Sequence, residues 1–244
     1  MDTPTEPRVA AAAPTPEARQ RWRLTFGRAA AADGETPAGR DYISAWEAAL
    51  RQSGLPVAIT EAGRIRFALG APLPARTAGQ AELADIWLTD RVAAWRVREA
   101  LERSLPGGHE LVALEDVWLG APALAGRVAA ADYRVTLRGN VPRDLYAACG
   151  RLMAAEHLIR ERAKGGGIRT YDLRPLLMSV GLVGVGDAPD GGHRAVSIRT
   201  RIHPELGSGR PEEVLAALED ELGEALEPVA TVRERLVLID DIDR

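Results

Sequence analysis

Arginine residues alternate with apolar residues in several segments of the chain, and they are its clearest groups for binding an anion. In an extended strand, side chains two positions apart point to the same face. The guanidinium group of arginine matches the geometry of phosphate and offers it two parallel hydrogen bonds. We therefore expect these side chains on sheet faces opposite the apolar core. They are Arg21 and Arg23, Arg64 and Arg66, Arg134 and Arg138, and Arg199 and Arg201.

No pattern typical of catalysis, metal binding or cofactor binding accompanies the arginines, so we expect none of these three kinds of site. The glycines at 165–167 follow a predicted helix and precede a predicted strand, the reverse of the order in a phosphate-binding loop. We interpret them as a helix C-cap and a turn. Lone Cys149 is expected to be a small buried apolar residue. The histidines lack metal-ligand spacing; they are His109, His157, His193 and His203.

The composition indicates a globular protein in a reducing compartment. The chain has 244 residues, of which 46% are hydrophobic, and a formal net charge of −4. This acidic total excludes the basic footprint of many nucleic-acid-binding proteins, although a local basic face is compatible with it. One cysteine excludes an internal disulfide, and no apolar run reaches the roughly 18 residues of a membrane-spanning helix. We expect a cytoplasmic protein that is not embedded in a membrane.

Hydrophobic periodicity predicts the same order of elements in both halves of the chain. Residues 1–20, rich in Pro, Thr and Ala, are expected to form a disordered tail. The expected strands are 21–28, 55–60, 64–69, 85–89 and 109–120, then 132–139, 168–173, 193–203 and 230–239. The expected helices are 41–54, 91–105, 142–163 and 211–226.

This order predicts an α+β protein built from two tandem ferredoxin-like βαββαβ units, with an extra strand in the first. The first unit is expected at 21–125 and the second at 126–244. In such a unit the helices cover one sheet face, and RNA-recognition modules use the other. Those modules place aromatic residues on the bare face, whereas Trp22, Phe67 and Tyr133 are expected on the apolar face here. A solvated face or an interface between the units explains the arginines at least as well as RNA binding.

Several stretches, taken in order, resemble a bacterial family known as the radical SAM-linked, or radical SAM-associated, domain of unknown function. The resemblance extends from about Trp22 to the C-terminus. Members are commonly encoded beside, or fused to, a radical SAM protein with a cobalamin-binding domain, so the resemblance implies that partner. The stretches are WEAALRQSGLP (46–56), RIRFALGAPLP (64–74), AADYRVTL (130–137), YDLRPLL (171–177) and RPEEVLAAL (210–218).

The chain also departs from the family pattern at two polar stretches. A typical His-Leu-Asp before the first helix is Gly39-Arg40-Asp41 here, and a typical Asn-Pro-His-Pro is missing between Gly63 and Arg64. TYDLRPL recurs in the family, which favours Asp172 and Arg174 as site residues, although a structural Asp–Arg pair is the simpler explanation. The candidate substrate-binding residues are therefore Asp41, Arg64, Arg66, Arg134, Arg138, Asp172, Arg174, Arg199 and Arg201.

Together these observations predict a non-enzymatic accessory protein that binds a substrate, RNA or a ribosome-related protein, and presents it to a separate radical SAM enzyme. The chain has no C-x-x-x-C-x-x-C motif and cannot hold the iron–sulfur cluster itself. The alternative is an RNA-processing endonuclease resembling the double-ferredoxin RNA endonucleases of CRISPR systems. The missing histidine stretches argue against that alternative. A purely structural subunit without a ligand is a third possibility.

Overall fold

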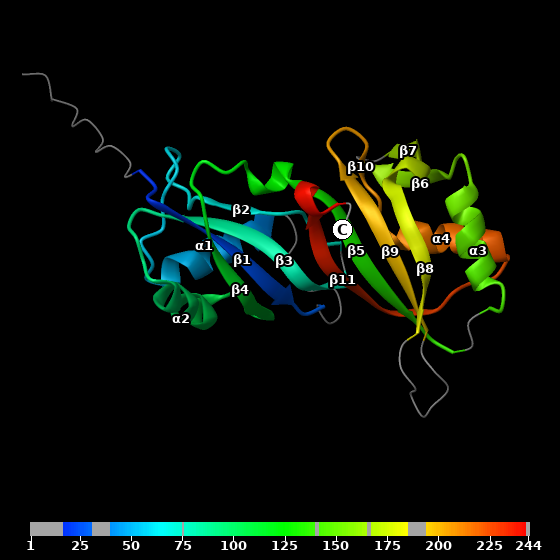
Figure 1. Cartoon of the computed structure of the whole chain (residues 1–244), viewed down its shortest axis with the longest axis horizontal. Coiled ribbons are helices and arrows are strands. Elements are labelled where there is room, and N and C mark those ends of the chain that lie inside the picture. Colours follow the sequence, from blue (N-terminus) through cyan, green and yellow to red (C-terminus); the bar gives the residue numbers. More distant parts are fainter. Residues whose placement is uncertain are drawn as a thin grey trace, which may run out of the picture.

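The computed structural model describes residues 17–30, 40–74, 76–139, 142–164, 167–184 and 194–242. Within these residues the protein is a mixed α+β structure with one large sheet and four α-helices (Figure 1). The α+β class predicted from the sequence is therefore confirmed. The predicted tail lies mostly outside the described residues, and Gln20, its last residue, already belongs to the first strand.

The first half forms four strands and two helices around its own core. Its strands have the order β2-β3-β1-β4, and each neighbouring pair is antiparallel. The core packs Trp22, Leu24 and Phe26 of β1 against Trp46 of α1 and Leu101 of α2. The elements are β1 (Gln20–Arg28), α1 (Arg40–Gln52), β2 (Phe67–Leu69), β3 (Thr77–Leu88), α2 (Ala94–Ser104) and β4 (His109–Val117).

The second half repeats this plan with the order β8-β9-β5-β11, again antiparallel throughout. Tyr133, Val135 and Leu137 of β5 face the core formed with the helices. The elements are η1 (Leu124–Gly126), β5 (Val128–Leu137), α3 (Leu145–Ala154), β6 (Ile159–Lys164), β7 (Gly167–Asp172), η2 (Arg174–Leu176), β8 (Leu177–Gly184), β9 (Arg194–His203), β10 (Gly207–Ser208), α4 (Pro211–Leu222), β11 (Pro228–Leu238) and η3 (Ile239–Asp241).

A short parallel pairing joins the two halves into one sheet. Thr231–Arg233 of β11 pair with Thr77–Gly79 of β3. We call this junction the seam. The remainder of β3 pairs with β2 and β1 of the first half, so β3 is the strand that both halves share.

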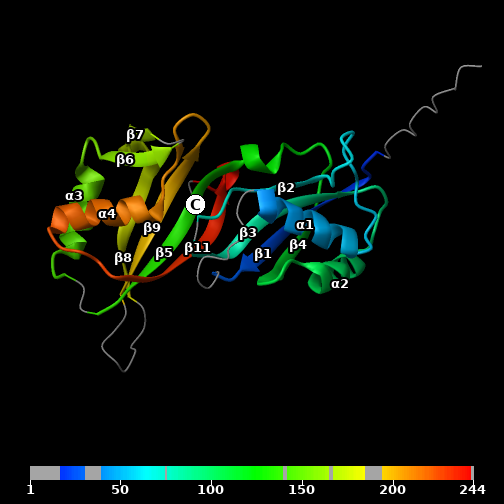
Figure 2. The ribbon, with the colours of Figure 1, turned by 180° about the vertical axis from the view of Figure 1, so that it is seen from behind.

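All four helices lie on one face of the sheet, as the opposite views in Figures 1 and 2 show. We call the other face the bare face. Over the first half, the linker that follows β4 crosses the bare face, because Arg21 donates hydrogen bonds to the carbonyl oxygens of Ala121 and Pro122. Over the second half, no α-helix of the described residues covers the bare face of β5, β9 and β11 (Figure 1).

The helix predicted at 142–163 is wrong beyond Ala154. Arg174 donates hydrogen bonds to the carbonyl oxygens of Met153 and Ala155, so it stabilises the C-terminal end of α3 there. The next residues form the β6–β7 hairpin, in which Lys164 pairs with Gly167. Gly165 and Gly166 lie outside the described residues. Because a strand and not a helix ends at Lys164, the helix C-cap predicted at the glycines is also wrong.

Three strand predictions also need correction. Residues 168–173 do not join the large sheet, because they pair with β6, and β8, which we did not predict, occupies that position. β3 starts at Thr77 instead of residue 85. The predicted strand 55–60 makes only two isolated bridges, Val57 with Leu88 and Ile59 with Ile65.

None of the helices in the described part of the chain is both long and apolar enough to cross a bilayer. The predicted boundary near residue 125 falls in η1, at the linker between the halves. The division of the chain into two units, 21–125 and 126–244, stays a prediction.

Candidate functional site

A group of charged side chains lies on the bare face of the second half, on three neighbouring strands. Asp132 of β5 stands opposite Arg199 of β9 and opposite Arg235 of β11 in the strand register. Their neighbours along β5 and β9, such as Tyr133 and Ile198, belong to the core under the helices. The charged residues therefore point to the opposite face. We call this group the bare-face cluster: Asp132, Arg134, Arg199, Arg201, Glu234 and Arg235.

Asp132 is the centre of the cluster. It accepts hydrogen bonds of 2.6 and 3.0 Å from Arg199 and one of 2.8 Å from Arg235. Burial raises the pKa of Asp132, but the hydrogen bonds and positive charges of the two arginines outweigh burial, so its pKa lies below the ordinary value. Asp132 is thus ionised at neutral pH and holds both guanidinium groups against the bare face.

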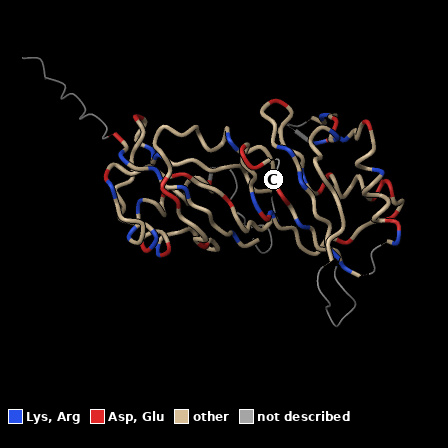
Figure 3. Tube along the Cα trace, viewed as in Figure 1, with Lys and Arg blue, Asp and Glu red and all other residues tan. Residues whose placement is uncertain are grey.

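The cluster nevertheless carries more positive than negative charge. Four arginines face two carboxylates, which leaves a formal charge of +2 on this patch. Arg134 approaches Glu234 at 3.3 Å, and Arg201 has no ion pair within the described residues. The side chain of Arg235 is 51% exposed and that of Arg134 is 38% exposed, so an incoming anion can reach both. Figure 3 shows basic and acidic segments side by side on these strands near the C-terminal end.

Exposed ion pairs of this kind contribute only about 0–1 kcal/mol each, because water solvates both partners well. An external phosphate can therefore compete with Glu234 for Arg134 without disrupting the fold. The spacing of neighbouring strands, about 4.8 Å, places several guanidinium groups within reach of successive phosphates on an extended strand. The bare-face cluster has the chemistry of an anion-binding surface.

The structure brings only three of the predicted site residues together in this cluster: Arg134, Arg199 and Arg201. Arg64 instead pairs with Glu47 of α1 at 2.8 Å, and Arg66 stacks on the ring of Trp87 in the first half. Arg138 is exposed in the loop after β5, and Asp41 is exposed in the first turn of α1.

Asp172 and Arg174 lie beside α3 and do not bind each other through their side chains. Asp172 accepts hydrogen bonds from the backbone N–H groups of Leu158 and Arg174, and its other oxygen contacts His157 at 2.8 Å. The guanidinium group of Arg174 donates to three backbone carbonyl groups, those of Met153, Ala155 and Leu177. These contacts hold the end of α3 and the start of β8 in place. The side-chain pair between Asp172 and Arg174 that we considered as the alternative is not formed, because each side chain binds other groups. A substrate-binding role for the two residues stays a prediction.

A second group of arginines on the bare face is buried, which the alternating pattern did not indicate. Arg21, 1% exposed, and Arg23 both bind Asp85, which is completely buried on β3. The ring of Trp87 lies between Arg21 and Arg66, with guanidinium-to-ring distances of 4.9 and 4.8 Å. The linker and the ring of Trp87 both contact Arg21, and a strand pattern gives no signal for either contact.

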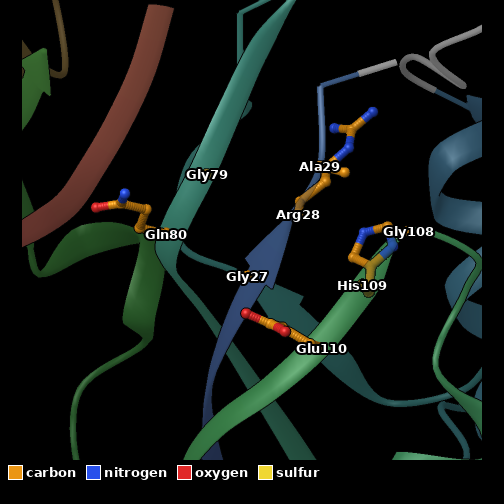
Figure 4. Close-up of a pocket in the computed structure, with 8 residues that line it drawn as sticks. All are labelled: Gly27, Arg28, Ala29, Gly79, Gln80, Gly108, His109 and Glu110. Carbon is orange, nitrogen blue, oxygen red and sulfur yellow. The ribbon is translucent and has the colours of Figure 1, made fainter. Parts of the chain in front are cut away.

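A hollow of about 520 Å³ lies where β1 ends and β3 and β4 begin (Figure 4). Arg28 and His109 line it, and the side chain of Glu110 lies over Gly27. A Cβ at position 27 would be 3.0 Å from the side chain of Glu110, so glycine leaves the space that this side chain occupies. With Arg28 and Glu110 on its walls, this hollow has no excess of either charge.

His109 in this hollow is engaged on both ring nitrogens. Its Nδ1 is 3.0 Å from the carbonyl oxygen of Pro106, so Nδ1 carries the proton and Nε2 accepts a hydrogen bond from the Tyr42 hydroxyl at 3.1 Å. Burial lowers the pKa of His109, and the charge of Arg28 acts in the same direction against the backbone acceptors. His109 is thus neutral at pH 7, but its free electron pair is occupied, which indicates a structural role.

At the seam, on the helix-bearing face, Arg233 of β11 and Glu82 of β3 form a buried bidentate ion pair. Their side chains are 1% and 5% exposed. Arg233 also donates to the carbonyl oxygens of Pro72 and Ala71. Glu82 reaches this position by lying over Gly79, where an added Cβ would be only 2.6 Å away. Sequence patterns had placed neither residue in a site.

Comparison with known proteins identifies the family. Residues 37–210 match the profile of the family described as "Uncharacterized protein conserved in bacteria (DUF2344)", and the chain belongs to this family. No curated protein matches the sequence.

Three solved structures are similar in part. One is titled "Crystal Structure of a Cbf5-Nop10-Gar1 Complex", with 11% identity and a TM-score of 0.45; the alignment covers 88% of this chain and 48% of that one. Another is titled "Crystal structure of pseudouridylate synthase", with 15% identity, a TM-score of 0.32 and coverages of 91% and 65%. The third, an unknown protein from Galdieria sulphuraria, has 16% identity, a TM-score of 0.23 and coverages of 86% and 99%. The chain thus spans about half and about two thirds of the first two proteins.

Proposed function

We propose that this member of the DUF2344 family is a non-catalytic binding protein that holds single-stranded RNA on the bare face of its second half and presents it to a separate radical SAM enzyme. The observation that carries the proposal is the bare-face cluster. Its four arginines outnumber its two carboxylates on a sheet face that no helix covers. Backbone contacts of this kind bind nucleic acid without reading its sequence.

The strand orders of the two halves support a finer description of the scaffold. In chain order, each half gives strand, helix, strand, strand, helix, strand, with the first and third strands in the centre of its part of the sheet. This is the arrangement of a ferredoxin-like unit. We therefore infer two such units in tandem, joined at the seam, with the β6–β7 hairpin and β10 as additions to the second.

The aromatic residues bear on how the RNA is held. Trp22 and Tyr133 lie in the cores, and Phe67 packs against one, as predicted. The bare-face cluster itself contains no aromatic side chain, so base stacking does not contribute there. RNA is held through its phosphates, and binding should be insensitive to base sequence and sensitive to salt.

The partner in this proposal follows from the family resemblance of the sequence motifs. A radical SAM protein with a cobalamin-binding domain would act on the client while this protein holds it. Co-expression with such a protein encoded beside this chain tests the partnership. A stable complex on size-exclusion chromatography supports it, and independent elution at micromolar concentrations contradicts it.

The RNA part is tested with a fluorescent single-stranded 12-nucleotide RNA of mixed sequence, in buffer with EDTA. If about four phosphates are engaged, affinity should fall by roughly 50-fold between about 50 and 200 mM salt. Absence of binding at about 50 mM salt contradicts the RNA proposal and leaves a protein client. Reproducible cleavage of the RNA in the same tubes would favour the endonuclease alternative instead.

A further inference from the structure

A pocket of about 380 Å³ lies between the β6–β7 hairpin and the segment that connects β9 to α4. Arg162, Arg169 and Tyr171 of the hairpin line one wall. The segment 204–207 and Arg210, which directly precedes α4, line the other. None of these residues belongs to the bare-face cluster, so the pocket is separate from the surface proposed to bind RNA.

Arg162 joins the two walls. Its Nε and Nη2 atoms donate to the two carboxylate oxygens of Glu213 on α4, at 2.7 and 2.6 Å. Nη2 also lies 3.2 Å from the carbonyl oxygen of Ser208 and 3.3 Å from the hydroxyl oxygen of Tyr171, whose ring the guanidinium group covers at 4.8 Å. These contacts fix the guanidinium group in the wall. Its Nη1 atom, with two N–H groups, has no acceptor among the residues that the structure describes.

Arg169 stands directly opposite Arg162 in the register of the hairpin. Side chains opposite each other on neighbouring antiparallel strands share a face, with Cβ atoms about 5 Å apart, and like charges in this arrangement are destabilising. Glu213 neutralises Arg162, but exposed Arg169 forms no ion pair in the described part of the chain. An anion bound between the two arginines would offset their repulsion.

Arg210 adds a third guanidinium group to the pocket. Its Nη1 atom is 3.8 Å from the carboxylate of Glu212, too far for a hydrogen bond, and its side chain is 46% exposed. Among the residues that line the pocket, Glu205 is the single carboxylate. Three guanidinium groups therefore line the pocket with one carboxylate, and two of them, those of Arg169 and Arg210, lack a closely bound counter-charge.

We propose that this pocket binds the doubly charged phosphate group of a phosphate monoester. The phosphate oxygens accept hydrogen bonds from Arg169, from Arg210 and from Nη1 of Arg162, a donor set that suits phosphate. Its two negative charges balance the two arginines without a close carboxylate. Pro204 and Leu206, which is 47% exposed, provide apolar surface for a small organic group. The phosphate belongs either to a free small molecule or to the end of an RNA, and the binding chemistry is the same.

The probe is phenyl phosphate, which is doubly charged at about pH 7.5 because the second pKa of a phosphate monoester is about 6. Phenyl sulfate has the same shape with one negative charge and serves as the comparison. Binding is followed by NMR through the backbone amides of Arg169 and Gly207. Phenyl phosphate should bind with a dissociation constant of about 0.1–1 mM, as expected for about eleven heavy atoms. Phenyl sulfate should bind about tenfold more weakly, because the arginines attract a smaller charge.

Three variants assign the contacts. Arg169→Gln and Arg210→Gln each remove one charged donor at an exposed position and should weaken phenyl phosphate about tenfold. Glu205→Gln removes the carboxylate from the wall and should strengthen binding about two- to threefold. Arg91→Gln, at an exposed position in the first half, is the matched control and should bind like the unaltered protein. Arg162 is kept, because its contacts hold the hairpin against α4.

Two forms of the 12-nucleotide RNA, one with a 5′-phosphate and one with a 5′-hydroxyl group, separate the two sources of the phosphate. Tighter binding of the phosphorylated form that Arg169→Gln abolishes identifies an RNA end, and no difference between the two forms identifies a free small molecule. Absence of amide shifts at about 10 mM phenyl phosphate, equal affinity for phenyl sulfate, or undiminished binding by Arg169→Gln would overturn the proposal. Because phenyl phosphate contains no RNA, these results are independent of RNA binding by the bare-face cluster.

Discussion

Asp132 on β5 lies directly opposite Arg199 on β9 and accepts two hydrogen bonds from its guanidinium group, while Arg235 binds the same carboxylate from the other side. One carboxylate therefore restrains two of the four arginines of the bare-face cluster. If this face binds RNA, Asp132 competes with the phosphates for both.

Asp132→Asn is accordingly expected to increase RNA affinity. The substitution preserves the shape of the side chain and raises the formal charge of the cluster from +2 to +3. One added charge near a phosphate is worth about 0.5–1 kcal/mol at a solvated surface, so affinity should rise by about two- to fivefold. Fluorescence anisotropy at about 50 mM salt measures the affinity of each protein for the RNA. Glu99→Gln on α2, which removes a carboxylate from the helix-bearing face, is the control and should bind like the unaltered protein.

The buried pair at the seam should be a major contributor to stability. Glu82→Gln leaves the Arg233 guanidinium buried without its counter-charge and should cost about 3–5 kcal/mol of unfolding free energy. The double change Glu82→Leu with Arg233→Met should recover much of this loss, because no unpaired charge remains. Urea unfolding measures each variant. Removing Glu99 from its exposed pair with Arg103 should change the unfolding free energy by less than about 0.5 kcal/mol. A similar small loss for Glu82→Gln would show that the seam tolerates an unpaired charge.

His109 should make stability depend on pH in the weakly acidic range. Burial lowers its folded-state pKa below the ordinary value, so the unfolded chain binds the proton more readily. The contribution of neutral His109 to the free energy of unfolding is therefore complete above about pH 6.5. It decreases as the pH falls toward the folded-state pKa. His109→Asn should remove this component, so the difference in melting temperature between the two proteins should narrow from pH 7.5 to pH 5. A constant difference over that range would contradict the assignment.

The sequence was a good guide to elements with regular apolar periodicity. In β1 the alternation of Trp22, Leu24 and Phe26 with polar residues corresponds to the buried and bare faces of the strand. α4 begins with Pro211, as predicted, but ends at Leu222 instead of residue 226, because Gly223, with a left-handed φ of 71°, caps it. Cys149 is buried, as predicted, and burial raises its thiol pKa.

Elements decided by long-range contacts were missed. Leu152 and Ile159 lie at helical spacing, but the chain leaves the helix between them because Arg174 binds the carbonyl groups at its end. Arg160 and Arg162 then pair with Asp220 and Glu213 of α4, which positions β6.

The candidate site was only partly predictable for the same reason. Alternation correctly placed Arg134, Arg199 and Arg201 on a bare face. It gave no indication that the linker buries Arg21, or that Arg64 turns toward Glu47 of α1. Nor did it bring Glu82 and Arg233 together, since they are 151 positions apart in the chain.

The most direct measurement of the central claim compares two double variants with equal changes in net charge. Arg199→Ala with Arg201→Ala removes two arginines from the bare-face cluster, and Arg98→Ala with Arg103→Ala removes two exposed arginines from α2. With the same 12-nucleotide RNA, the first variant should bind at least about tenfold more weakly than the unaltered protein. Its plot of log affinity against log salt concentration should also be less steep, by about 1.4 in slope. The second variant should keep the affinity and the slope of the unaltered protein. Equal losses in the two variants would show that RNA responds only to the overall charge, and unchanged affinity in the first would show that the bare face does not bind RNA.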